Sequence, residues 1–270
     1  MNSQSKIGAL IPVRLASERL PGKALRLVNG RPVIAYLLDR VAQCRYLDRK
    51  DIVVCTTTDP SDDLLEEVAR GEGVSVFRGD TDDLIKRFRD AMVAHGFSAV
   101  VQVDGDDPLT DPQYMSLTME TLLADDQLGI VWSEGLPLGV NCKSFTRSAM
   151  NMVYSSYVAG QNDTGFIYYF TKTDILGKKI IRPVDSRHVL DGVRLTLDYE
   201  EDLAVIGEIL TRLDRPGAPA PLAEVVAFLK ENPQIADKSQ GLDEQYWQRT
   251  RDKAVLSYRD KGGAVLRIQV

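Results

Sequence analysis

The chain has 270 residues, 44% of them hydrophobic, which suits one large α/β domain or two small ones around an ordinary soluble core. Its formal net charge of −6 argues against a general affinity for nucleic acid or for a membrane surface, because both normally require a basic face. No stretch approaches the ~20 apolar residues of a membrane span, and the N-terminus lacks a signal-peptide layout. We therefore expect a cytoplasmic protein. The scattered cysteines Cys44, Cys55 and Cys142 are expected to be buried, reduced thiols.

Short β-rich runs alternate with helix-periodic stretches through the first half of the chain. The runs cover residues 6–13, 51–57, 74–78 and 99–104. Apolar residues follow them at helical spacing, as at Val33, Ile34, Leu37, Leu38 and Val41 after Pro32, and at Leu64, Leu65 and Val68 after Asp59-Pro60. This order predicts a mostly parallel sheet covered by helices on both faces, with ligands bound beyond the carboxyl ends of the strands.

The second half of the chain is less regular. We expect strands at 129–133, 178–184 and 192–198, a hairpin through 136–145, a linker at 213–222, and helices at 222–231 and 243–258. The alternation fails between about 135 and 180, which we interpret as an insertion in a domain spanning residues 1–215. Residues 216–270 are then expected to form a helical extension packed on that domain.

The stretch IPVRLASERLPGKAL, residues 11–25, carries several cations and little to bury. Arg14, Ser17, Arg19, Gly22 and Lys23 would offer charges, a hydroxyl and backbone N–H groups to one small volume at the end of the first strand, as a triphosphate requires. The stretch matches neither the P-loop nor the dinucleotide-binding glycine motif. On composition alone, a solvated basic loop explains it equally well.

Aspartates gather after two of the expected strands. Asp104, Asp106 and Asp107 follow the fourth strand, and Asp198 ends the run at 192–198, whereas Asp111 is expected to cap a helix that begins at Pro112. If the two strands are neighbours, Asp106 and Asp198 meet at one edge of the sheet. Crowded carboxylates repel one another unless a cation or solvent relieves them, and for Asp106 we favour a hard divalent metal over an ordinary turn.

These motifs together resemble the cytidylyltransferases that activate sugar acids such as KDO and sialic acids. Residues 11–25 are similar to the family signature IPARxxSxRLPGK, GDDPLTDP to its GDxPLIDP segment, and LTLDYEED to VDxxED. The run VFRGDTDDLIKRF looks most like the spore-coat-polysaccharide branch. The resemblance implies a three-layer α/β/α nucleotide-diphosphosugar transferase fold of the Rossmann-like GT-A type, with a small dimerisation insertion and a homodimer as the assembly.

The resemblance also implies an activity: Mg²⁺-dependent transfer of CMP from CTP to an anionic, sugar-acid-like acceptor, with release of pyrophosphate. By position, Arg14, Lys23, Asp106 and Asp198 would act in catalysis, and Asp106 and Asp198 would hold Mg²⁺. The nucleotide-binding set would be Pro12, Val13, Arg14, Ser17, Arg19, Gly22, Lys23, Arg78 and Asp104. Two other functions stay open: a glycosyltransferase-like protein that uses a nucleotide sugar, and a non-catalytic nucleotide-binding module.

Several positions depart from the family pattern or admit two interpretations. Asp104 replaces a glutamine of the KDO enzymes, and QNDTGF at 161–166 replaces REHVT of the spore-coat branch, so the acceptor is not defined. Arg78 could contact the nucleotide or cap its strand. His95 and His188 are expected to be structural or exposed, and Tyr168, Tyr169 and Phe170 to lie in the core.

Overall fold

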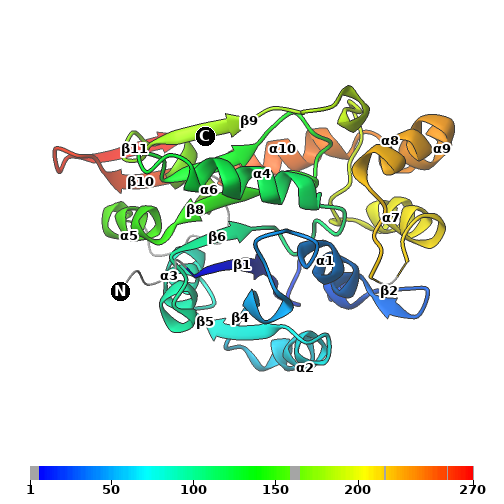
Figure 1. Ribbon diagram of the computed structural model, residues 1–270, viewed down its shortest axis with the longest axis horizontal. Coiled ribbons are helices and arrows are strands. Elements are labelled where there is room, and N and C mark those ends of the chain that lie inside the picture. The colour runs from blue at the N-terminus through cyan, green and yellow to red at the C-terminus, as the bar shows by residue number, and fades with distance from the viewer. Residues whose placement is uncertain (1–5, 159–164, 216, 254, 270) are drawn as a thin grey trace.

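The computed structural model describes residues 6–158, 165–215, 217–253 and 255–269. Its centre is a seven-stranded sheet in the order β5-β4-β1-β6-β8-β7-β9 (Figure 1). Neighbouring strands run parallel except on both sides of β8, which is antiparallel to β6 and β7. The sheet strands are β1 (Ile7–Pro12), β4 (Ile52–Thr57), β5 (Ser75–Gly79), β6 (Ala99–Gln102), β7 (Ile130–Ser133), β8 (Lys143–Thr146) and β9 (Lys178–Ile181).

Two helical layers cover the sheet, as the alternating sequence pattern predicts. One apolar core lies under α1 (Val33–Val41), α2 (Asp63–Gly71), α4 (Pro112–Leu123), α7 (Glu200–Arg212) and α8 (Leu222–Glu231). The other lies under α3 (Leu84–His95), α5 (Arg147–Ser156) and α6 (Phe166–Thr171). The three-layer mixed α/β fold predicted from the sequence is therefore confirmed.

Most helix starts follow the predicted chemistry. The Asp111 carboxylate accepts hydrogen bonds from Gln113 and Tyr114 N–H groups at the start of α4, and that of Asp59 accepts one from Ser61. Pro32 lies one position before α1, as its N-cap. Leu64 is the exception on the predicted apolar faces, because its side chain is exposed.

The expected insertion at about 135–180 contributes to the central sheet, because β8 lies within it and β9 begins at its end. The hairpin expected through 136–145 is displaced: β8 at its end pairs antiparallel with β7 (Ile130–Ser133), which was predicted as a separate strand. The expected strand at 192–198 is wrong: that segment makes a single bridge, between Arg194 and Leu138. Its main-chain N–H groups instead donate to two loops, from Leu195 to Leu138 O and from Leu197 to Asp106 O.

The C-terminal part departs from the predicted all-helical extension. After α9 (Pro233–Ala236), α10 (Leu242–Lys253) ends well before residue 258, and Val255–Arg259 forms strand β10 instead. This strand pairs with β11 (Val265–Gln269), and the resulting hairpin packs beside α6 (Figure 1). Val255, Leu256 and Tyr258 favour a strand, and alternate residues Leu256 and Tyr258 are buried. A smaller hairpin joins β2 (Leu27–Val28) to β3 (Arg31–Pro32).

Candidate active site

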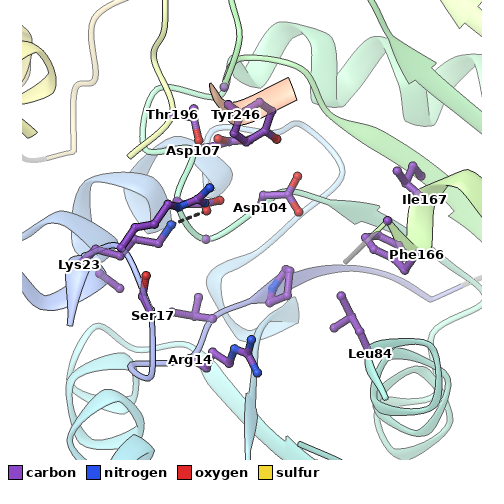
Figure 2. Close-up of a pocket in the computed structure, with 18 of the residues that line it drawn as sticks. Arg14, Ser17, Lys23, Leu84, Asp104, Asp107, Phe166, Ile167, Thr196 and Tyr246 are labelled. Atoms are coloured by element: carbon purple, nitrogen blue, oxygen red, sulfur yellow. Dashed lines mark hydrogen bonds and ion pairs between the residues drawn. The ribbon is translucent and has the colours of Figure 1, made fainter. Parts of the chain in front are cut away.

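A cavity of about 510 Å³ opens beyond the carboxyl ends of β1 and β6 (Figure 2). The basic loop after β1 forms one side, with Arg14 and Ser17, and the loop after β6 contributes Asp104 and Asp107. Tyr246 and Thr196 lie on the wall across the cavity from Arg14 and Ser17 (Figure 2). The position agrees with the general rule that open α/β sheets bind ligands at this edge.

The basic loop is held in shape by a buried carboxylate. Asp62, of which 1% is exposed, accepts a hydrogen bond of 2.7 Å from Leu15 N–H and further ones from the hydroxyls of Thr56 and Thr57. The loop closes on itself where Gly22 N–H donates to Leu15 O at 3.0 Å. Gly22 has a φ of +66°, which explains why the position carries glycine.

Lys23 lies between the two aspartates that the sequence assigns to one metal site. Its Nζ atom is 2.6 Å from Asp106 Oδ2 and 3.0 Å from Asp198 Oδ1. Arg19 also makes an ion pair with Asp198 Oδ1. The expected repulsion between the two carboxylates is therefore offset by cations of the basic loop, which the sequence reasoning did not anticipate.

Asp198 reaches Asp106 without a sheet ladder. Leu197 N–H donates to Asp106 O at 2.7 Å, and this main-chain bond brings the next residue, Asp198, beside the loop after β6. Gly139 allows the close approach, since a Cβ on it would lie 2.4 Å from Thr196 N and its φ is +91°. The juxtaposition predicted from neighbouring parallel strands is present, but its predicted cause is wrong.

Arg194 connects Asp198 to the C-terminal helix. Its guanidinium is 1% exposed and lies 3.5 Å from Asp198, 3.2 Å from Asp202 and 3.0 Å from Asp243 of α10. The same guanidinium lies 5.2 Å from the centre of the Tyr246 ring, in cation–π geometry. One buried cation thus fixes a predicted metal ligand and an element from the far end of the chain.

The charges in this cluster stabilise one another's ionised forms. Burial would lower the pKa of Lys23, but the charges of Asp106 and Asp198 outweigh burial and raise it. Burial would likewise raise the pKa of Asp106, but the ammonium of Lys23 outweighs that and lowers it. Asp107 differs: burial, with the neighbouring charges of Asp106 and Asp104, raises its pKa well above the usual range.

The predicted nucleotide-binding residues mostly meet in the cavity. Its lining includes Pro12, Val13, Arg14, Ser17, Arg19, Lys23, Asp104 and Asp106. Asp198 makes ion pairs with two of these residues, Lys23 and Arg19. Gly22 does not line the cavity but allows the turn of the basic loop through its positive φ.

Arg78 is the predicted residue that the structure places elsewhere. Its side chain donates hydrogen bonds to the main-chain oxygens of Thr57 and Asp59 and pairs with Asp63 and Glu66 of α2. These bonds secure the end of β4 to the start of α2. Arg78 was expected either to contact the nucleotide or to cap its strand, and its observed contacts support the second role.

Sequence reasoning gave no role to several lining residues. Leu84, Arg87, Phe166 and Thr196 lie in stretches that were compared with the family but were not assigned to the site, whereas Asn141, Lys143, Ile167, Tyr246 and Trp247 come from segments without a recognised motif. Lys143 Nζ lies 2.6 Å from Asp104 Oδ2, and Gln102 donates to the other Asp104 oxygen at 2.8 Å. Lys143 is the first residue of β8, and the position of this strand next to β6 was not predictable from the sequence.

The histidines and aromatic residues largely behave as expected. His188 is buried and its Nδ1 lies 3.0 Å from the Tyr114 hydroxyl, which marks a structural role, and neither histidine is among the residues lining the cavity. Tyr169 and Phe170 belong to the core, whereas Tyr168 lines the cavity. Residues 161–164 of the QNDTGF stretch lie outside the described residues, and Gly165 and Phe166 line the cavity. The three cysteines are buried thiols, as predicted.

A three-layer α/β fold with a basic loop facing paired aspartates at the strand ends is the arrangement of a nucleotidyltransferase. The chain belongs to the cytidylyltransferase family, whose sequence model matches residues 8–170. This confirms the resemblance found in the signature motifs. The model match ends before the Asp198 segment and α10, but LTLDYEED at residues 195–202 is itself one of the stretches that resemble the family.

Individual relatives agree with this assignment. The spore coat polysaccharide biosynthesis protein SpsF of Bacillus subtilis is 27% identical over 84% of this chain and 95% of its own length. A 3-deoxy-manno-octulosonate cytidylyltransferase of Yersinia enterocolitica is 28% identical over 62% of both chains. A cytidylyltransferase structure from Leptospira borgpetersenii superposes with a TM-score of 0.75 and 25% identity, covering 86% of this chain and 97% of the other.

Proposed function

We propose that the protein transfers CMP from CTP to a sugar-acid acceptor and releases pyrophosphate. The observation that carries this proposal is the meeting of Lys23 with Asp106 and Asp198 in a cavity lined by the basic loop. In the reaction, an acceptor hydroxyl attacks the α-phosphorus, the bond to the β-phosphate breaks and the hydroxyl proton is released. Lys23, Arg19 and Arg14 hold the triphosphate in line and neutralise the charge that builds on the leaving pyrophosphate.

The two aspartates fit Mg²⁺ as a cofactor. Both present carboxylate oxygens within 3.0 Å of one nitrogen, so they lie close enough to serve one hydrated ion. Among the described residues, no group of three or more His, Cys, Asp or Glu side chains could hold a metal alone. Magnesium tolerates such a site because it keeps several waters and takes phosphate oxygens as ligands. When bound, it would supply positive charge to the phosphates.

The acceptor class follows from the relatives. One relative is a 3-deoxy-manno-octulosonate cytidylyltransferase, and another is a spore coat polysaccharide biosynthesis protein. The cavity wall adds Lys143, a cation whose Nζ pairs with Asp104. These features support an anionic, polyhydroxylated acceptor and a place in surface polysaccharide synthesis.

We extend the proposal to a homodimer in the cytoplasm. No helix in the described parts of the chain is long and apolar enough to cross a membrane.

The test mixes the purified protein with Mg²⁺, each of the four ribonucleoside triphosphates, and a panel of sugar acids including 3-deoxy-manno-octulosonate and N-acetylneuraminate. Pyrophosphate release that requires both CTP and a sugar acid is the expected result. Equal turnover with all four triphosphates, or none with any acid, would contradict the proposal. Light scattering tests the dimer, and a monomer at assay concentration would contradict that part alone.

A further inference from the structure

The cavity has a second wall, to which α10 contributes residues that lie beyond those the family model matches. Tyr246 and Trp247 come from α10, whereas the family match ends at residue 170. Figure 2 shows Tyr246 and Thr196 across the cavity from Arg14 and Ser17, with Asp104 between the two sides. If the triphosphate occupies the basic loop, the wall formed by α10 faces the volume left for the acceptor.

Tyr246 is held firmly enough to recognise a ligand. Its ring stacks against the guanidinium groups of Arg194 and Arg19, 5.2 and 6.0 Å from the ring centre. Arg194 also pairs with Asp243, one helical turn earlier, so the helix and the ring share one anchor. Burial and the charges of Asp106, Asp107, Asp198 and Asp104 raise the pKa of the phenol, which keeps it neutral and able to donate a hydrogen bond.

An unsatisfied polar atom lies on the lining of the same cavity. Asn141 Oδ1 is buried and has no hydrogen-bond partner within the described chain. A buried acceptor without a partner costs free energy, so it marks a position where a ligand donor would be favourable. Lys143 lies two residues further along, and its Nζ is paired with Asp104. A hydroxyl donor, rather than another carboxylate, complements Asn141.

We propose that Tyr246, together with Trp247 and Asn141, determines acceptor specificity by receiving the hydroxylated ring of the acceptor. The inference rests on the proposed function and adds which residues select the acceptor. The aromatic pair offers an apolar face to the C–H side of a sugar ring, the phenol donates to a ring substituent, and Asn141 accepts from a hydroxyl. The C-terminal helix thereby belongs to the acceptor site, and the basic loop to the nucleotide.

The experiment compares Tyr246→Phe with the wild-type protein in the pyrophosphate assay. The probe is the panel sugar acid with the highest wild-type turnover. Phenylalanine keeps the ring and its stacking on Arg194 but removes the hydroxyl, so we expect about a tenfold rise in KM for the acid. The KM for CTP should stay within about twofold, because phenylalanine keeps the ring that packs against Arg19 of the nucleotide site. Asn141→Leu should likewise raise the KM for the acid and leave the KM for CTP nearly unchanged.

Tyr46→Phe is the matched control, because Tyr46 is a tyrosine outside the cavity whose hydroxyl accepts a hydrogen bond from Arg45. It should change neither KM. Equal changes in both KM values, or unchanged KM values with a lower Tm, would assign Tyr246 a structural role and overturn the inference. Absence of wild-type turnover with every acid is a different result, because it overturns the proposed function together with this extension.

Discussion

Lys23 Nζ lies 2.6 Å from Asp106 Oδ2, and the same nitrogen lies 3.0 Å from Asp198 Oδ1. The lysine proposed to bind phosphate therefore occupies the place proposed for the metal. Under the proposed function, we expect Lys23 to turn to the phosphates when the nucleotide binds, with a divalent ion taking its place beside the carboxylates. Each ligand thus removes an obstacle to the other, which predicts coupled binding.

Calorimetric titration measures this coupling directly. We expect CTP to bind at least about tenfold more tightly with Mg²⁺ than without it. In Lys23→Gln, Mg²⁺ alone should bind more tightly than in the wild type, because the carboxylates have lost their internal counter-ion. Weaker or unchanged binding of Mg²⁺ alone to this variant would contradict the exchange.

Lys23→Ala should affect both catalysis and folding. Only 13% of the Lys23 side chain is exposed, and removing it leaves the buried Asp198 with fewer cations. We expect about 10²-fold lower turnover, the scale of one electrostatic stabiliser, and a loss of about 2–3 kcal/mol in the free energy of unfolding. The measurements are steady-state kinetics and urea unfolding. Near-normal turnover of this variant would show that Lys23 does not take part in the reaction.

Asp62→Asn should weaken the basic loop at its anchor. Burial would raise the pKa of Asp62, but hydrogen bonds from Leu15, Thr57 and Thr56 outweigh burial and lower it below the ordinary value of 3.8. The ionised carboxylate therefore stabilises the fold above about pH 3.8, and this contribution is lost as the pH falls through the folded-state pKa.

We expect the variant to lose about 2–4 kcal/mol of unfolding free energy at pH 7, and the difference from the wild type to shrink below pH ~3.8. Urea unfolding at several pH values measures it. If the difference in unfolding free energy between the two proteins does not change with pH, the charge of the Asp62 carboxylate is not what stabilises the loop.

Arg78→Ala should leave nucleotide binding intact, since Arg78 contacts the end of β4 and the start of α2. The dissociation constant for CTP should stay within about twofold of the wild type, and Tm should fall slightly. Arg14→Ala is the matched comparison, because Arg14 lines the cavity, and it should weaken CTP binding by about tenfold or more. A similar loss of CTP affinity in both variants would contradict this prediction and show that Arg78 contributes to nucleotide binding.

The parts predictable from the sequence are those carried by local patterns. The three-layer fold was predictable from the strand runs, the helical faces and the Asp111 cap. The signature at residues 11–25 located the basic loop. Contacts made by distant main-chain atoms were not predictable. The Leu197–Asp106 bond replaced the expected strand, and Asp62, Lys143 and Tyr246 reach the site through tertiary packing that leaves no local periodicity.

The pairing of Lys23 with Asp198 also has a consequence for synthesis of the chain, because the two residues are 175 positions apart. A nascent chain that has already formed the first strands and the basic loop still lacks Asp198, Arg194 and the segment that carries them. The proposed metal site is therefore complete only after most of the polypeptide has left the ribosome and the Asp198 segment has docked. Since a ligand that binds only the completed fold stabilises that fold alone, CTP with a divalent ion would act late in biogenesis and leave the early intermediates unaffected.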